Sequence, residues 1–126
     1  MIPGKYNINI WRGSTWNPGV QQERLDFASY DEIRMQIRPP FVKGIPTKPA
    51  LLELSLANGR ITLEDSNQIL RLTISAADTK KLPFDEGVYD LELVKHADLD
   101  ATPPITEETV DKFLYGKVTV HGEQTV

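Results

Sequence analysis

Apolar and polar residues alternate in several short segments of this sequence, and this pattern constrains the fold more than any other feature. In segment 32–40, Ile33, Met35 and Ile37 alternate with polar side chains until two prolines end the run. Successive side chains of a β-strand point to opposite faces, so this period gives a strand one apolar face. The same pattern predicts about seven strands, in segments 5–13, 32–40, 51–59, 60–64, 69–75, 88–96 and 113–122.

Turn signals between these segments favour an antiparallel β-sandwich. Asn58 and Gly59 end segment 51–59, immediately before segment 60–64. This dipeptide predicts a hairpin in which the two segments pair. The chain lacks a helical pattern of ten or more residues between its strands, which argues against a parallel α/β sheet. A length of 126 residues suits one domain. We therefore expect a single antiparallel β-sandwich over residues 1–126.

One short interruption has the sequence of a helical turn. Ser75 and Asp78 have the spacing of a helix N-terminal cap, and Pro83 prevents the helix from continuing beyond Leu82. Residues 75–82 should therefore form a helical corner of about one and a half turns. We expect this corner to carry the chain from one sheet of the sandwich to the other.

Two longer connections stand apart from the strand pattern. Segment 39–49 holds four prolines and a glycine, and segment 97–108 is acidic and contains two prolines. Both exceed ordinary hairpin loops in length. Loops of this kind are common sites of partner contact, although surface insertions without a function explain them equally well.

Composition excludes several classes of function. The chain has no cysteine, which excludes disulfides, thiolate catalysis and cysteine-based metal sites. Its net charge is -4 and its basic residues are scattered, so we expect no nucleic-acid partner. The sequence has no apolar run long enough to span a membrane and no recognisable secretory signal. We expect synthesis and folding in the cytoplasm.

The polar residues form no recognisable catalytic or ligand-binding motif. His96 lies near Asp98 and Asp100, but the segment lacks the glycine and the distal glutamate of a calcium loop, so a surface loop is the better interpretation. The stretch RGST, residues 12–15, lacks the second glycine and the lysine of a phosphate loop. We therefore predict no catalytic residue, no metal site, no cofactor and no small-molecule substrate.

Exposed apolar residues are the better candidates for function. The alternation places Tyr6, Ile8 and Ile10 on one face of the first strand and Trp11 on the other, where it either covers a second core layer or marks a partner surface. Trp16 lies at a predicted turn and could serve in either way. Aromatic side chains are enriched at interface hot spots. Together with apolar residues of the long connections, the candidate interface residues are Trp11, Trp16, Phe41, Val42, Ile45, Leu99 and Ile105.

Five stretches, taken in order, resemble a known family. They are YNINIWRGSTW, LDFASYDEIRMQIR, LLELSLANGRITL, LRLTISAADTKKLPFDEGVYDLEL and FLYGKVTVHGEQT. This series is similar to small virion structural proteins of tailed bacteriophages, over nearly the whole chain. The resemblance implies an all-β, immunoglobulin-like component of the tail, baseplate or neck (collar), without enzymatic activity. Segments 41–48 and 94–108 are longer here than in the family, which suggests contacts with neighbouring subunits.

The resemblance leads to a structural role as the main hypothesis. The expected partners are other virion proteins and further copies of this chain, held by protein–protein contacts in a symmetric oligomer within the virion. Two alternatives stay open: a host-surface or carbohydrate-binding module, which could use exposed Trp and Tyr, and a capsid decoration protein. An enzyme has the least support, because it would need a cleft with clustered titratable groups.

Overall fold

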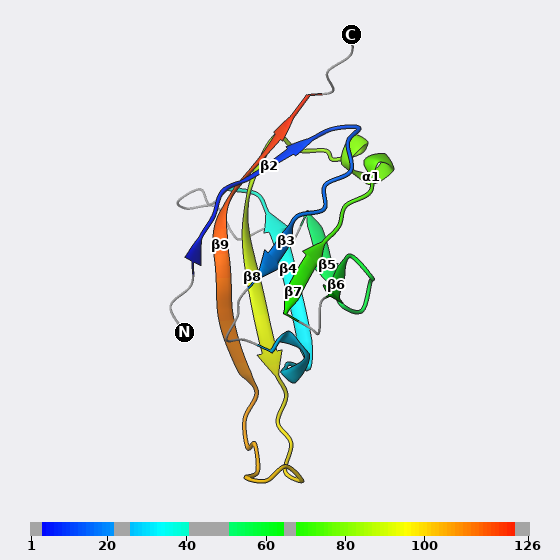
Figure 1. Cartoon of the computed structure of the whole chain (residues 1–126). Helices are drawn as coiled ribbons and strands as arrows, with labels where there is room; N and C mark the ends of the chain where they lie inside the picture. The colour runs from blue at the N-terminus through cyan, green and yellow to red at the C-terminus, as the bar shows by residue number, and fades with distance from the viewer. Residues whose placement is uncertain (1–3, 22–25, 41–50, 65–67, 123–126) are drawn as a thin grey trace.

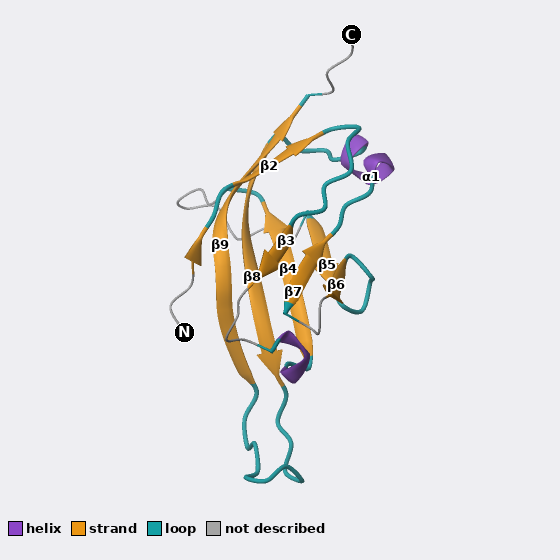
Figure 2. Cartoon of the chain, in the orientation of Figure 1, coloured by secondary structure: helices purple, strands orange, loops and turns teal. Residues whose placement is uncertain are grey.

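The computed structural model describes residues 4–21, 26–40, 51–64 and 68–122. Within these ranges, two β-sheets and two short helical segments form an all-β sandwich of the immunoglobulin-like kind, which confirms the predicted fold class. Figure 1 shows the elements in chain order, and Figure 2 shows how small the helical contribution is.

The larger sheet has six strands and runs through most of the molecule. Its order is β1-β9-β8-β4-β5, and β2 also pairs with β9. The pairings β9–β8, β8–β4 and β4–β5 are antiparallel, as predicted, whereas β1 and β2 run parallel to β9. The strands are β1 (Gly4–Lys5), β2 (Ile8–Trp11), β4 (Glu32–Arg38), β5 (Leu52–Ser55), β8 (Glu86–Lys95) and β9 (Thr109–His121).

The smaller sheet has three antiparallel strands in the order β3-β7-β6. These are β3 (Gly19–Gln21), β6 (Ile61–Glu64) and β7 (Ile69–Leu72). An isolated bridge between Trp16 and Ile74 extends the β3–β7 pairing, with N–O distances of 2.9 and 2.8 Å. The short 3₁₀ helix η1 (Phe27–Ser29) precedes β4, and Asp26 caps it by accepting a hydrogen bond from the Ala28 amide.

The core lies between the two sheets and is built from the predicted apolar faces. Ile33, Met35 and Ile37 of β4 are buried, while the residues between them are partly exposed. The alternation thus works as the sequence indicates, because each strand turns one face inward and one outward. The other buried side chains from the predicted strand segments include Ile8, Ile10, Leu54, Ile61, Leu70, Leu72, Ile74, Tyr89, Leu91, Leu93, Val118 and Val120.

The hairpin predicted at Asn58-Gly59 is wrong. β5 pairs with β4 in the large sheet, whereas β6 pairs with β7 in the small sheet, so this turn carries the chain between the sheets. Gly59 has a positive φ of 77°, as a turn residue often does. The Asn58 side chain accepts hydrogen bonds from the Ser55 and Arg60 amides, both at 3.0 Å. The Asn58 side chain thus pairs with backbone amides on both sides of the turn, where a hairpin would have had backbone hydrogen bonds between its two strands.

The predicted helical corner is confirmed. Helix α1 (Ala76–Lys80) begins after Ser75, whose hydroxyl accepts a hydrogen bond from the Asp78 amide at 3.2 Å. Since β7 belongs to the small sheet and β8 to the large one, the corner does connect the two sheets. Its buried residue Thr79 ties it to the turn after β2: the Thr79 hydroxyl donates to the Ser14 carbonyl at 2.8 Å and accepts from the Gly13 amide at 3.1 Å.

Of the two predicted long connections, the structure describes one in full and the other only in part. Segment 97–108 joins β8 to β9 as the end of a long hairpin, and Figure 1 shows it projecting beyond the sheets. Of segment 39–49, only residues 39 and 40 belong to the described part of the chain. Among the described residues, no helix is long and apolar enough to span a membrane.

Candidate binding cleft

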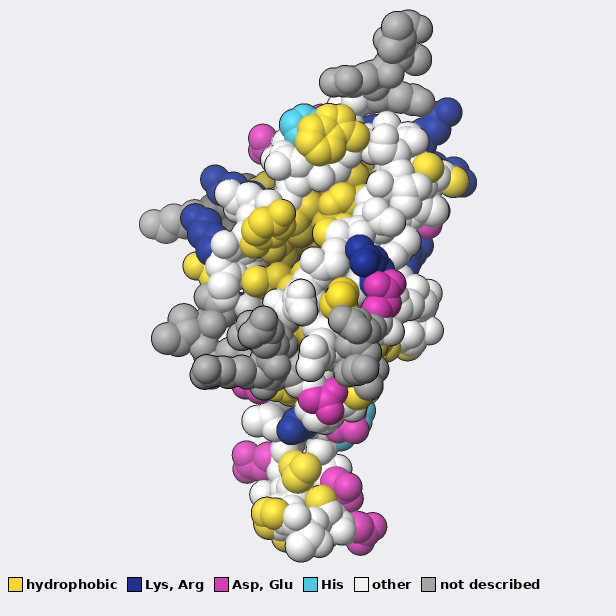
Figure 3. Space-filling model, viewed as in Figure 1, with side chains coloured by type: hydrophobic (Ala, Val, Ile, Leu, Met, Phe, Trp, Pro, Cys, Tyr) yellow, Lys and Arg dark blue, Asp and Glu magenta, His cyan; other side chains and the backbone are white. Residues whose placement is uncertain are grey.

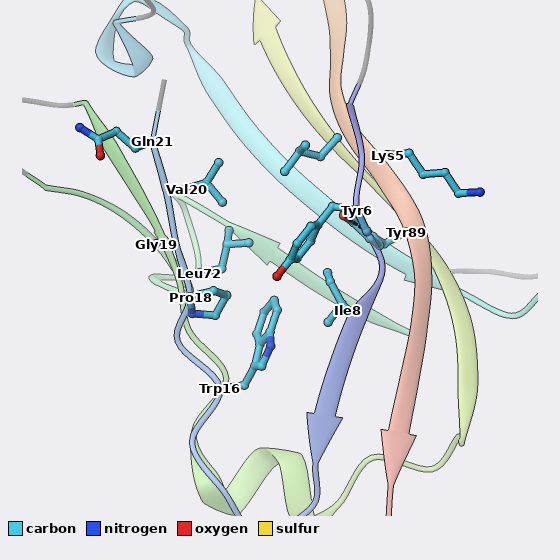
Figure 4. Close-up of a pocket in the computed structure, with 11 residues that line it drawn as sticks. Lys5, Tyr6, Ile8, Trp16, Pro18, Gly19, Val20, Gln21, Leu72 and Tyr89 are labelled. Atoms are coloured by element: carbon cyan, nitrogen blue, oxygen red, sulfur yellow. Dashed lines mark hydrogen bonds between the residues drawn. The ribbon is translucent and has the colours of Figure 1, made fainter. Parts of the chain in front are cut away.

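An apolar cleft of about 410 Å³ opens between the edges of the two sheets. We call it the edge cleft. Among the described strands, β1 pairs only with β9 and β3 only with β7, so the two sides of the cleft are edge strands. Figure 3 shows hydrophobic side chains gathered in this hollow, and Figure 4 shows the side chains around it. The lining residues are Lys5, Tyr6, Ile8, Trp16, Pro18, Gly19, Val20, Gln21, Leu72, Tyr89 and Leu114.

A break between β1 and β2 places Tyr6 at the cleft. The parallel pairing with β9 ends at Lys5 and resumes at Ile8, although the Tyr6 amide still donates to the Tyr115 carbonyl at 2.9 Å. At the break the Lys117 amide donates to the Asn7 side chain at 3.1 Å instead of to the backbone. Tyr6 is 61% exposed, so the prediction that it shares the buried face of Ile8 is wrong. The interrupted ladder turns its ring out of the core and into the cleft.

Tyr89 fixes this break from inside the sandwich. Its hydroxyl donates a hydrogen bond of 2.6 Å to the Tyr6 carbonyl, which lacks a ladder partner at this point. Gly116 is the residue opposite Tyr89 on β9. A Cβ atom at Gly116 would lie 2.2 Å from the Tyr6 carbonyl oxygen, so the β1–β2 connection passes directly over a position that only glycine fits. The geometry of one side of the cleft therefore depends on Gly116 and Tyr89.

Burial raises the pKa of Tyr89 to about 12, with a smaller contribution from Tyr6. Its ordinary value is near 10. Ionisation would replace the hydroxyl donor with a charge at a residue that is only 3% exposed. The hydroxyl is therefore a structural donor at neutral pH.

This shift predicts a stability change in alkaline solution. The unfolded chain loses the tyrosine proton near pH 10 and the folded chain only near pH 12, so the contribution of Tyr89 is complete below pH 10 and decreases towards pH 12. We expect the free energy of unfolding, measured by urea titration, to fall by about 2–3 kcal/mol more in the wild type than in Tyr89→Phe over this range. Equal losses in the two proteins would contradict this assignment.

The chemistry of the cleft suits apolar contact. Among the lining residues that the structure describes, Lys5 is the one charged residue and none is acidic. In the described part of the chain, every buried side-chain nitrogen or oxygen has a hydrogen-bond partner, so none points unpaired into the cleft. A cleft of this composition suits contact with apolar side chains, and Figure 4 shows the Lys5 side chain directed away from the hollow.

The two histidines lie apart from the cleft. His96 is at the end of β8, where its Nε2 lies 2.8 Å from a Glu32 carboxylate oxygen, and this hydrogen bond raises the pKa of His96. His121 is near the end of β9, 3.0 Å from the Asn9 side-chain oxygen. Within the ranges that the structure describes, no three His, Asp or Glu side chains gather closely enough to hold a metal ion.

The structure places the candidate interface residues in three different regions. Trp16 is partly buried in the edge cleft. Trp11 is 44% exposed and stacks on His121 at 4.6 Å between ring centroids, so it lies on the outer surface and does not cover a second core layer. Leu99 and Ile105 belong to the end of the β8–β9 hairpin. Phe41, Val42 and Ile45 lie outside the described residues.

Most of the cleft was not among the residues singled out from the sequence. The alternation pattern assigns Tyr6 and Leu72 to the core faces of predicted strands. No sequence signal marks Val20. The cleft arises where the two sheets diverge at their edges. One local signal was present: Gly116, inside an otherwise regular strand, marks a close approach of two backbones.

Comparison with known proteins gives little information beyond the fold. No family model matches the chain, and no curated protein matches it. Among solved structures, one match is a parallel homodimer structure of the extracellular domains of the voltage-gated sodium channel beta4 subunit, described in terms of cell–cell adhesion. The sequences are 12% identical, 96% of each chain is covered, and the TM-score is 0.38. We draw no functional conclusion from a similarity of this size.

Proposed function

We propose that this chain is a non-enzymatic structural component of a tailed-bacteriophage particle, located in the tail, baseplate or neck. It would act through protein–protein contacts in a symmetric assembly. The sequence resemblance supplies the kind of particle. The edge cleft is the observation that supports a role in protein–protein contact, because it is an apolar surface between two edge strands and none of its described lining residues is acidic.

Several properties of the cleft favour a protein partner. Edge strands present unpaired backbone groups that a neighbouring chain can use. Tyr6 and Trp16 come from the two segments that flank the hollow, and Figure 4 shows their aromatic side chains pointing toward one another. Aromatic anchors next to an apolar pocket are typical of interface hot spots. A partner segment could therefore pair with an edge strand and place its apolar side chains in the cleft.

The proposal is tested on purified particles. Particles produced by the host that carries the gene are banded in a density gradient and digested for mass spectrometry. We expect peptides of this chain to follow the major virion proteins through the gradient, in a fixed ratio to them. Peptides found only in the soluble fraction would contradict a virion role.

A carbohydrate-binding module is the second candidate, because Tyr6 and Trp16 could stack on a sugar ring in the cleft. The almost wholly apolar lining offers few groups for sugar hydroxyls, which favours the protein partner. A glycan array distinguishes the two. Binding by the wild type that is lost in Trp16→Ala would support the sugar-binding alternative, and no binding by the wild type would reject it.

A further inference from the structure

We propose that His96 is a pH-dependent tie at the base of the β8–β9 hairpin. When its imidazole is charged, it holds the hairpin end, residues 97–108, against the start of β4, and when the charge is lost the hairpin end loosens. The tie acts within the isolated chain, so it does not depend on the proposed virion role.

The hairpin end is joined to the large sheet through a break in the β8–β9 ladder. The regular pairing ends with Lys95 and Thr109. Beyond it, the two arms meet again at the bridge between Asp98 and Ile105, with N–O distances of 2.7 and 2.8 Å. His96 is the first residue of the break, and Figure 1 shows the hairpin end extending beyond it. A few residues at the end of a strand are enough to form a hinge.

His96 connects this break to the start of the neighbouring strand. Its backbone amide donates to an Asp31 carboxylate oxygen at 2.6 Å, and its ring Nε2 lies 2.8 Å from a Glu32 carboxylate oxygen. Both acidic residues are fixed to the sheet, because the Asp31 amide donates to the Val94 carbonyl at 2.8 Å and Glu32 is the ladder partner of Val94. The amide contact does not depend on the state of the imidazole. The ring contact is stronger when the imidazole is charged.

The charges around the imidazole make this contact sensitive to pH. The hydrogen bond to Glu32 is the main cause that raises the pKa of His96, and desolvation opposes it. The negative charges of the two carboxylates at the start of β4 raise this pKa further, and so does Glu108, which lies on the other arm of the hairpin. Lys95, the basic neighbour on β8, lies over the Tyr30 ring, with its Nζ 5.1 Å from the ring centroid. The charged imidazole therefore attracts carboxylates from both the sheet and the second arm.

The raised pKa sets the direction of the effect. An ordinary histidine loses its proton near pH 6.5, and in the folded chain His96 keeps its charge to higher pH. The contribution of the tie is therefore complete below about pH 6.5 and is lost as the pH rises through the pKa of His96 in the folded chain. Without the imidazolium, Glu108 is repelled by Asp31 and Glu32, and this repulsion favours movement of the second arm away from β4.

Spin-label mobility measures this movement directly, because the chain has no cysteine of its own. Leu99→Cys places a nitroxide at the exposed tip of the hairpin end, and Thr62→Cys places one at an exposed position on β6 as the matched control. Spectra of the full-length chain are recorded at about pH 5.5 and about pH 9, on the two sides of the range in which histidine titrates. The Leu99→Cys chain is also prepared with His96→Gln and with His121→Gln.

We expect the Leu99→Cys label to move at least about twofold faster at the higher pH, because release of the tie adds motion of the whole hairpin end to that of the label. With His96→Gln, the fast motion should be present at both pH values. His121→Gln removes the other histidine and should leave the response as it is, and the Thr62→Cys label should not respond. A response of equal size with His96→Gln, or no response without it, would overturn the proposal.

Glu32→Gln gives a second, independent measurement, since it keeps a hydrogen-bond acceptor and removes the charge. We expect the pKa of His96, followed by NMR titration of its ring protons, to fall in this variant, and the pH response of the label to decrease with it. The side chains of His96 and Glu32 are 50% and 48% exposed, so both variants should keep the wild-type thermal unfolding midpoint. An unchanged pKa in Glu32→Gln would show that the tie is absent in solution and would reject the proposal.

Discussion

Gly116→Ala should destabilise the protein by about 3 kcal/mol or more, because the added methyl group overlaps a neighbouring backbone. The new Cβ would lie 2.2 Å from the Tyr6 carbonyl oxygen and 2.8 Å from the Tyr6 carbonyl carbon. Both atoms belong to the main chain, so no side-chain rotation relieves the overlap. The β1–β2 connection would have to move away from β9, and the hydrogen bond from Tyr89 to Tyr6 would be lost with it.

Gly122→Ala is the matched control, because an added Cβ at Gly122 meets nothing within 4 Å. Urea unfolding should separate the two variants, with Gly122→Ala close to wild type. Wild-type stability in Gly116→Ala would show that the β1–β2 connection is not held against β9.

Thr79→Val should cost about 2–3 kcal/mol, although it changes the shape of the side chain very little. The Thr79 hydroxyl donates to the Ser14 carbonyl and accepts from the Gly13 amide, and Thr79 itself is fully buried. A methyl group in its place would leave both backbone groups without this partner. The hydroxyl also lies 3.0 Å from the Ala76 carbonyl inside the helical corner.

Thr79→Ser keeps the hydroxyl and serves as the control, so it should retain most of the stability that Thr79→Val loses. The measurement is the free energy of unfolding from urea titration of both variants. The same turn is held by Arg12, which donates to the Phe84 carbonyl and pairs with Asp85, both at 2.8 Å. A neutral effect of Thr79→Val would mean that Arg12 alone fixes the turn against the corner.

The strand positions and the core could be predicted from the sequence because they depend on local alternation. The face of Ile33, Met35 and Ile37 is buried as the period requires. The helical corner could be predicted for the same reason, since Ser75, Asp78 and Pro83 are local signals. These features need no knowledge of which strand pairs with which.

The errors concern pairing, which local patterns do not determine. Asn58-Gly59 has the sequence of a hairpin turn, yet its flanking strands belong to different sheets. Here the burial of β6 against β7 outweighs the local turn preference. Tyr6 continues the alternation of Ile8 in the sequence, but the break over Gly116 turns it outward. That break is set by a residue more than a hundred positions away.

The candidate site was the least predictable part of the molecule. The edge cleft is lined by Tyr6, Trp16, Val20 and Leu72 and by side chains from β8 and β9. These residues come from both sheets, so they become neighbours only when the two sheets pack together. Of the residues proposed from the sequence, Trp16 reaches this cleft and Leu99 forms the exposed tip. Aromatic character and exposure in a long connection were the signals that found them.

We propose that this chain holds a phage particle together through its edge cleft, and a cryo-electron microscopy reconstruction of purified particles would show what occupies that cleft. We expect several copies in a symmetric arrangement in the tail, baseplate or neck, with density for a neighbouring chain inside each cleft, between β1 and β3. A reconstruction in which the chain is absent, or in which its cleft faces solvent in every copy, would contradict it.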